Sequence, residues 1–475
     1  MKERLLPVKV INALKVDNAE ALFNNKGFYT FHEGDSTNWH KYTKMDGIGS
    51  SLVLDFGKEM SGYIHIFTGW VHTASCKVRI RFGESLGEVN SELGEKNSTN
   101  DHATRDFIAN LPASGQAVFG PTGFRYVRID VLEEKYVFLR NIFCINEIYS
   151  TKQIYDYKGD DKRIKEIFDV AKRTIDLCAG KGYIVDGVKR DRLIWVGDLE
   201  PEIMALTTLY DDFEVIKNTL DIAREQFPLP RYMNDMYTYS FWYIIIMNDL
   251  LERFKCDSYI KENLDYLTKL VSNMKELISE KGEINKEKAY LVDWPTAKTE
   301  DEEVGVRCIF MMAMNAAEKL FKKFNVILND VNELKKRLLV KPYDVKEKKQ
   351  VIALKYFAFG KISDKEYEML IKDGVKGFST FMSYYLLTAI ASKDKKLAIE
   401  MMKDYYGAML DKGATTFWED FNIDSIKDAG RIDEINPNKK DLHGDNGAFC
   451  YIGYRHSLCH GWSSGVIKFI KENCW

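Results

Sequence analysis

The stretch Asp186-Gly-Val-Lys-Arg-Asp-Arg-Leu-Ile-Trp-Val-Gly-Asp198 holds three aspartates, two arginines and a tryptophan, and it lies between two segments of helical period. One interpretation is a solvated, salt-bridged loop whose last residue, Asp198, caps the next helix. The other is a functional loop, because carboxyl groups beside an aromatic ring suit acid–base chemistry on a sugar. Taken by itself, the stretch is compatible with either interpretation.

The chain around this stretch and after it has the period of α-helices. Ile164, Ile167, Phe168, Ala171 and Ile175 recur mainly at spacings of three and four, as an amphipathic helix requires. Similar segments predict helices at 199–226, 236–254, 259–280, 301–324, 347–359, 364–372, 379–392, 394–411 and 463–472. The long loops between them carry four tryptophans and many of the acids, and loops of this length are usually functional. The pattern resembles a helical toroid with a site at one end.

The first 150 or so residues instead alternate between apolar and polar side chains. This period of two runs through Ser51–Phe56, Tyr63–Phe67, Lys77–Phe82 and Tyr126–Val131. Short strands of this kind, separated in places by Gly-rich turns, predict a β-sandwich or barrel ahead of the helical part.

Composition excludes several classes of protein. The 475 residues are 45% hydrophobic and 29% charged, which excludes a disordered or fibrous chain, and the net charge of −3 argues against nucleic acid as a partner. The sequence has no stretch of about 18 apolar residues that could cross a membrane, and Met1–Pro7 lacks the apolar core of a signal peptide. The eight cysteines are scattered, as is typical of reduced thiols. We therefore expect a soluble, cytoplasmic protein.

Two short motifs have weak support. Gly461–Gly465 matches the Gly-x-Ser-x-Gly form of serine hydrolases, but no strand pattern precedes it and no His follows it. His456 and His460 are four residues apart, without a clear third metal ligand. We expect no metal and no cofactor.

A second acidic patch, Gly413–Asp420, places Glu419 and Asp420 directly after Trp418. Two carboxyl groups far apart in sequence fit the two sides of one sugar ring, where one protonates the leaving oxygen and the other activates water. Tryptophan faces would lower the local polarity and keep the acid protonated near neutral pH. For any single tryptophan, core packing is an equally good interpretation.

The order of these pieces resembles glycoside hydrolase family 78, the bacterial α-L-rhamnosidases. In that family a patch Asp-x-x-x-Arg-Asp-Glu-Arg-x-x-Trp-x-Gly-Asp opens a helix, and Asp186–Asp198 is similar to it, with one residue fewer between Arg190 and Arg192. Later motifs of the family are similar to Asp293-Trp294, Gly413–Glu419 and Ser457–Ser463. Its preceding β segment is similar to Leu54–Gly57, Arg81–Glu84 and Phe124–Val127.

This resemblance implies a multidomain β and α fold. A jelly-roll-like β-sandwich would cover residues 1–155, and an (α/α)6 toroid of six helical hairpins, the catalytic barrel, would cover residues 156–475. The chain looks like a short form without the C-terminal β-sandwich of many family members. The implied activity is inverting, exo-acting hydrolysis that releases terminal α-L-rhamnose, or a similar deoxy sugar, from a small rhamnose-containing glycoside or oligosaccharide. The sequence does not decide between a monomer and a homo-oligomer.

The resemblance also implies the site residues. Glu419 corresponds to the general base and Asp191 to the general acid. The residues implied to bind the sugar or to wall its pocket are Asp186, Arg190, Trp195, Asp198, Trp242, Asp293, Trp294, Trp418 and His460.

The chain departs from the family at the acid, where Asp191 stands in place of a Glu. Because Asp is one methylene shorter, its carboxyl would lie roughly an ångström further from the same target. Glu200 and Glu202 are substitute candidates, although we expect both to project from the following helix. Two alternatives therefore accompany the main prediction: a six-hairpin enzyme acting on another sugar, and a sugar-binding pseudoenzyme with impaired hydrolysis.

Overall fold

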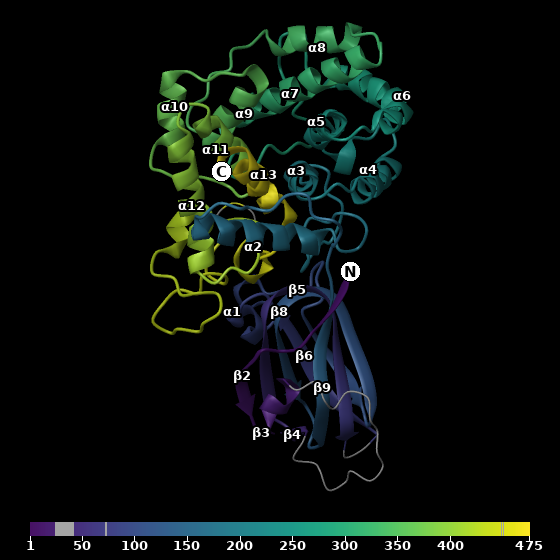
Figure 1. The fold of residues 1–475 in the computed structure, drawn as a ribbon, viewed down its shortest axis with the longest axis vertical. Coiled ribbons are helices and arrows are strands. Elements are labelled where there is room, and N and C mark those ends of the chain that lie inside the picture. The colour runs from purple at the N-terminus through teal and green to yellow at the C-terminus, as the bar shows by residue number, and fades with distance from the viewer. Residues whose placement is uncertain (24–41, 72–73, 448, 450) are drawn as a thin grey trace.

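The computed structural model describes residues 1–23, 42–71, 74–447, 449 and 451–475. A domain built on β-strands is followed by a larger domain built from helices (Figure 1). The last strand ends at Glu147 and the first long helix begins at Lys162. That helix starts where the sequence provides a cap, because the Asp161 side chain accepts hydrogen bonds from the backbone N–H groups of Arg163 and Ile164.

The described part of the sheet domain has nine antiparallel strands joined into one sheet. They are β1 (Lys2–Leu5), β2 (Lys9–Leu14), β3 (Val16–Asp17), β4 (Thr43–Asp46), β5 (Ser51–Val71), β6 (Ser75–Gly83), β7 (Asp106–Pro112), β8 (Gly115–Val131) and β9 (Tyr136–Glu147). The main order is β3-β4-β9-β5-β8-β6-β7, while β1 pairs with β9 and β2 with β5. The long strand β5 contains two of the predicted strands, Ser51–Phe56 and Tyr63–Phe67. Its pairing with β8 shifts register between Asp55 and Met60 and then resumes, so the two predicted strands form one continuous strand.

The alternation seen in the sequence produces the core of this domain. On β6, Val78, Ile80 and Phe82 are buried, whereas Lys77 is exposed. Side chains two residues apart point to the same face of a strand, so every second residue joins one apolar cluster shared by the central strands.

Within the described residues, the helical domain contains twelve α-helices. They are α2 (Lys162–Cys178), α3 (Leu199–Leu209), α4 (Glu214–Gln226), α5 (Tyr237–Arg253), α6 (Asp257–Asn273), α7 (Glu302–Lys323), α8 (Asn329–Leu338), α9 (Lys349–Phe359), α10 (Asp364–Ile371), α11 (Ser383–Ala391), α12 (Lys395–Asp411) and α13 (Val466–Asn473). Six of them, α3, α5, α7, α9, α11 and α13, contact one another in a closed ring, and each is preceded in the chain by an outer helix. The predicted order, a β domain followed by a six-hairpin helical toroid, is confirmed, while the described strands of the β domain form one antiparallel sheet and the jelly-roll-like sandwich stays a prediction.

Short helices complete the list of elements. They are α1 (Leu86–Asn90) and the 3-10 helices η1 (Ala19–Phe23), η5 (Glu95–Asn97), η6 (Met233–Asp235), η7 (Met274–Leu277), η8 (Ile423–Ile426), η9 (Gly453–Arg455) and η10 (Gly461–Gly465).

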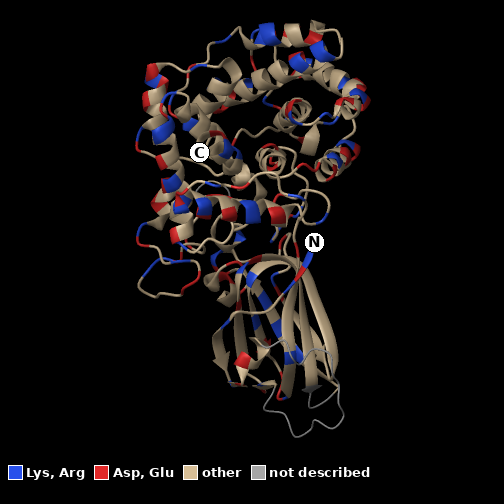
Figure 2. Ribbon diagram, viewed as in Figure 1, with Lys and Arg blue, Asp and Glu red and all other residues tan. Residues whose placement is uncertain are grey.

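Burial separates the inner from the outer helices. The outer helix α4 buries one stripe, from Val215 to Ala223, and is polar elsewhere. The inner helix α5 is buried on all sides from Tyr237 to Asn248, as expected for a helix enclosed by others. In Figure 2 the charged residues of both signs alternate along the outer helices, and the inner helices are mostly uncharged.

Two helix predictions need correction. The predicted helix 199–226 is broken at Tyr210 into α3 and α4. Helix α8 was not predicted, although Val331, Leu334 and Leu338 have helical spacing and form its buried stripe. Across the described residues, no helix has both the length and the apolar character that a membrane span requires.

Candidate active site

A cavity of about 390 Å³ opens among loops of the helical ring. Most of its wall comes from the segments that lead into the inner helices α3, α5, α7 and α13, because each outer helix returns the chain to the same end of the ring. Five carboxyl groups face it, from Asp186, Asp191, Asp198, Glu302 and Glu419. Six aromatic side chains share the wall: Trp195, Tyr239, Tyr290, Trp294, Tyr451 and Trp462. The volume lies in the range of about 300–1,000 Å³ found for small-molecule sites.

Most of the predicted site residues meet in this cavity. Those that line it are Asp186, Arg190, Asp191, Trp195, Asp198, Trp294, Glu419 and His460. They come from three loops that are widely separated in the chain, so the ring brings together what the sequence keeps apart.

Trp242 does not line the cavity, which corrects its predicted place in the pocket wall. It lies in the middle of α5, is completely buried, and packs against Phe381 and Tyr385 with ring centroids 6.0 and 5.6 Å away. The aromatic residue that α5 contributes to the wall is Tyr239, in its first turn.

Asp293 and Trp418 also lie outside the cavity lining. The Asp293 carboxylate accepts hydrogen bonds from the Ser379 hydroxyl at 2.5 Å and from the backbone N–H of Trp294 at 2.8 Å. Trp418 packs edge-on against Phe421 and lines a different, smaller cavity. Asp293 therefore orients the neighbouring Trp294, and Trp418 belongs to the packing behind the site.

The acids of the Asp186–Asp198 loop either bind the backbone of the loop or face the cavity. Asp186 accepts from the backbone N–H of Leu193 at 2.8 Å, and its carbonyl accepts from Gly461 at 2.7 Å. Asp198 stands at the N-cap position of α3, but its side chain makes no capping hydrogen bond and faces the cavity instead. Of the two interpretations of this stretch, the functional loop is the one that the geometry favours.

Hydrogen bonds hold both the side chain and the backbone carbonyl of Glu419. Its carboxylate accepts from Nη2 of Arg190 at 2.5 Å and from the backbone N–H of Ser457 at 3.0 Å. Its carbonyl accepts from the Thr380 hydroxyl at 2.7 Å and from Nε1 of Trp462 at 2.9 Å. A carboxylate held in this way cannot turn away from the cavity.

The surroundings shift the pKa values of these acids in opposite directions. Burial opposes the ionisation of Glu419, but Arg190 and the nearby histidines outweigh it and lower its pKa to about 2. Burial raises the pKa of Asp186 and of Asp198 well above the usual value, and neighbouring carboxylates add to the effect for both. The cavity thus combines a carboxyl group whose pKa is lowered with others whose pKa values are raised, an arrangement that acid–base catalysis uses.

Asp191 shares Arg190 with Glu419. Nη1 of Arg190 donates to Asp191 at 2.5 Å, while Nη2 of the same guanidinium donates to Glu419. Asp191 and Arg192 both have left-handed φ angles, 53° and 57°, which turn the chain sharply at this point. Left-handed residues outside glycine are uncommon and cluster at functional sites.

Sequence reasoning missed Tyr239, Tyr290 and Tyr451 in the cavity wall. The Arg190 guanidinium stacks on the Tyr451 ring, 3.9 Å from its centroid. The chain has 26 tyrosines, so no single one stands out. The only available signal was that Tyr451 lies in the same long loop as Glu419.

The Gly-x-Ser-x-Gly match and His456 have structural roles, whereas His460 lines the cavity. Ser463 of the Gly-x-Ser-x-Gly match lies in η10, and its hydroxyl donates to the carbonyl of His460. His456 accepts from the backbone N–H of Asp420 at 2.8 Å, and burial lowers its pKa to about 3.

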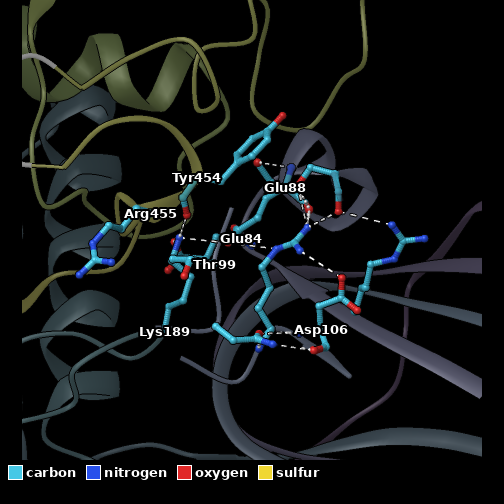
Figure 3. Close-up of polar contacts among 12 residues, drawn as sticks. Glu84, Glu88, Thr99, Asp106, Lys189, Tyr454 and Arg455 are labelled. Atoms are coloured by element: carbon cyan, nitrogen blue, oxygen red, sulfur yellow. Dashed lines mark hydrogen bonds and ion pairs between the residues drawn. The ribbon is translucent and has the colours of Figure 1, made fainter. Parts of the chain in front are cut away.

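A buried ionic cluster joins the sheet domain to the loops of the site. Figure 3 shows the Lys189 ammonium beside Glu84 and Glu88, 3.0 and 3.1 Å from their oxygens. Glu84 in turn accepts from the backbone N–H of Leu458 at 2.6 Å, one residue beyond the Ser457 N–H that binds Glu419. The sheet domain therefore supports the loop that holds the base.

Glu84, Glu88 and His443 are close enough together to bind a metal ion. However, Lys189 already brings a positive charge to both carboxylates. Both His443 ring nitrogens are engaged, Nδ1 with the Ser85 hydroxyl and Nε2 with the carbonyl of His456. The donor set is therefore that of an ion-pair cluster.

A helical ring of six hairpins with carboxyl groups and aromatic rings around one cavity is the architecture of a six-hairpin sugar-active enzyme. Two family models match the chain in order: the bacterial α-L-rhamnosidase concanavalin-like domain over residues 48–146 and the bacterial α-L-rhamnosidase 6 hairpin glycosidase domain over residues 152–327. Together they match more than half of the chain. The chain belongs to the bacterial α-L-rhamnosidases, glycoside hydrolase family 78, enzymes that hydrolyse O-glycosyl bonds.

Solved structures share the fold at low sequence identity. A rhamnosidase from Klebsiella oxytoca with rhamnose bound is 18% identical, with a TM-score of 0.75, over 99% of this chain and 96% of that one. A family 78 rhamnosidase of Bacillus sp. GL1 is 17% identical, with a TM-score of 0.67, over 89% of this chain and 46% of that one. An α-L-rhamnosidase of Streptomyces avermitilis complexed with L-rhamnose is 14% identical, with a TM-score of 0.56, over 88% and 42%. The chain thus spans nearly all of the first protein and less than half of the other two. No curated protein matches it.

Proposed function

We propose that this chain is an inverting, exo-acting α-L-rhamnosidase that releases terminal L-rhamnose, or a similar deoxy sugar, from short glycosides. The observation that carries the proposal is the single Arg190 guanidinium that bridges Asp191 and Glu419 at the wall of an aromatic-lined cavity. Inverting glycosidases hold their two carboxyl groups about 6.5–9.5 Å apart, which leaves room for a water molecule. The Arg190 guanidinium contacts both carboxyl groups, Asp191 through Nη1 and Glu419 through Nη2, so the two acids of the proposed pair lie on the same wall of the cavity.

In the proposed reaction, Asp191 protonates the glycosidic oxygen and Glu419 takes a proton from water on the opposite face of the sugar. The low pKa of Glu419 keeps it ionised at neutral pH, as a base must be. Asp186 and Asp198 would bind sugar hydroxyls, while Trp195 and Trp294 would cover the apolar face, including the C6 methyl of a deoxy sugar.

The test is hydrolysis of a panel of aryl and alkyl glycosides, with the first-formed anomer followed by NMR. We expect turnover of α-L-rhamnosides with initial release of β-L-rhamnose, the inverted anomer. Turnover of a different glycoside only would favour another six-hairpin enzyme. Saturable rhamnose binding without turnover would favour the sugar-binding alternative.

Asp191→Asn is expected to reduce kcat/KM for an alkyl α-L-rhamnoside by about 10²–10⁴-fold, the typical contribution of a general acid. The matched control is Glu200→Gln, which removes the substitute acid on α3. Glu200 is buried outside the cavity lining, and burial raises its pKa to about 8, so Gln resembles the protonated side chain already present. Full activity in Asp191→Asn together with loss of activity in Glu200→Gln would reassign the acid.

A further inference from the structure

A loop of the sheet domain reaches the proposed acid. This loop, residues 98–105, connects η5 to β7. Its Ala103 forms an antiparallel bridge with Arg190, and the backbone N–H of Asp191 donates to the carbonyl of His102 at 3.1 Å. The left-handed turn that carries Asp191 is therefore held from outside the helical ring.

The His102 side chain extends this contact to the carboxyl group itself. Its Nδ1 lies 2.5 Å from Oδ1 of Asp191, and 59% of the His102 side chain is exposed, against 10% of that of Asp191. Its other ring nitrogen, Nε2, lies 3.6 Å from Asp101, which pairs with Arg455. The imidazole thus connects the acid in the cavity to a charged rim that is open to water.

Asp191 needs a neighbour of this kind if it acts as a general acid. Both of its carboxyl oxygens have a close partner: Nη1 of Arg190 lies 2.5 Å from Oδ2, and Nδ1 of His102 lies 2.5 Å from Oδ1. In every turnover the acid also loses its proton inside a cavity that the bound glycoside fills. The contact with the exposed imidazole offers a route for the return of the proton that does not pass through the cavity.

We propose that His102 is a positioning residue that stores and returns the proton of Asp191, so that the sheet domain completes the acid half of the active site. The inference rests on the proposed function, in which Asp191 is the acid.

The protons balance over one cycle. At the start, the His102–Asp191 pair holds one proton in its short contact. As the glycosidic C–O bond breaks, Asp191 passes that proton to the leaving oxygen and is left as a carboxylate. On the other face of the sugar, water transfers a proton to Glu419 while its oxygen bonds to the anomeric carbon. Glu419 then releases a proton to bulk water, and the exposed imidazole takes one up.

Other charged groups face this pair from several elements. Asp186, Asp198 and His460 interact with Asp191 across the cavity, and Arg190 binds it directly. Asp101 and Arg455 lie on the solvent side. Removal of the imidazole would leave Asp191 with Arg190 as its close polar partner and without a neighbour that can carry a proton.

His102→Asn is the matched variant for the test. His102 has a φ of 56°, in the left-handed region that asparagine tolerates better than most residues. The Asn amide retains a donor near the position of Nδ1 but has no proton to transfer. The substrates are an alkyl α-L-rhamnoside, whose leaving group needs protonation, and the 2,4-dinitrophenyl α-L-rhamnoside, whose leaving group does not.

We expect His102→Asn to lower kcat/KM about tenfold or more for the alkyl substrate and less than about threefold for the dinitrophenyl substrate. The pH profile for the alkyl substrate should change, because the imidazole no longer takes part in the proton transfer. Equal losses on both substrates would indicate a merely structural role and overturn the inference. Wild-type rates with an unchanged pH profile would overturn it as well.

A second measurement does not depend on hydrolysis. In NMR spectra of the full chain with ¹⁵N-labelled histidine, the Nδ1 proton of His102 should resonate far downfield and move upfield in Asp191→Asn. A resonance unaffected by Asp191→Asn would overturn the shared proton. If this resonance responds while the wild-type protein cleaves no rhamnoside, the proposed function fails and the proton link to Asp191 is supported.

Discussion

Replacing Glu419 by Gln should lower kcat for rhamnoside hydrolysis by about 10³-fold, within the range by which a general base contributes to catalysis. Gln has the same shape but cannot accept a proton from water. Its one amide oxygen can still accept one of the two hydrogen bonds, from Arg190 or from the Ser457 N–H, that different oxygens of Glu419 now accept. Rhamnose binding, measured by calorimetry, should therefore persist while steady-state turnover is lost.

The adjacent acid provides the control for this prediction. Asp420 lines a different cavity from Glu419, and its carboxylate accepts from the backbone N–H of Phe449 at 3.1 Å. Asp420→Asn should retain kcat within about tenfold, since its side chain does not face the proposed substrate. A Glu419→Gln enzyme with wild-type kcat would rule out Glu419 as the base.

Replacing Lys189 by Met should destabilise the protein by about 3–5 kcal/mol, the usual cost of removing one partner from a buried ion pair. Lys189, Glu84 and Glu88 are all nearly inaccessible to water, so Met would leave Glu84 without its counter-charge and Glu88 with only the more distant Arg105, 3.9 Å away. The measurement is the free energy of unfolding in urea.

The loss of stability in Lys189→Met should increase with pH. Burial already raises the pKa of Glu84 to about 7, although Lys189 lowers it in part. Without Lys189 the folded-state pKa rises further above the unfolded value, so stability is lost as pH increases and the penalty should be larger at pH 8 than at pH 5.

Lys269→Met is the matched control for charge removal. Lys269 pairs with Asp265 on the surface of α6, where the two side chains are 65% and 78% exposed. Such a pair contributes only about 0.3–0.5 kcal/mol, so this variant should remain close to wild type. Equal stability losses in the two variants would contradict the role of the buried cluster.

Much of the fold could be predicted from local patterns. The change from a period of two to the helical period separates the sheet domain from the ring, because each element buries one face and the spacing of apolar residues records that face. The split at Tyr210 was missed because apolar residues continue at helical spacing on both sides of it.

The site residues could be predicted where several residues suited to the chemistry lie together in one loop. Asp186, Asp191 and Asp198 lie in one loop with Trp195, and all four line the cavity. Trp242 shows the limit of this reasoning. It lies in a helix that is buried on every side, so no periodic pattern in the sequence indicates whether its ring points to the cavity or to the core.

The sequence by itself determined the two kinds of domain, their order, and the acids and tryptophans available for chemistry, because these depend on spacing along the chain and on residue type. The tertiary structure alone decided which of them meet. Arg190 bridges Asp191 and a Glu419 that is 229 positions away, and His102 reaches Asp191 from another domain. Such contacts depend on how the ring closes and how the sheet docks against it, and neither is encoded in a local pattern.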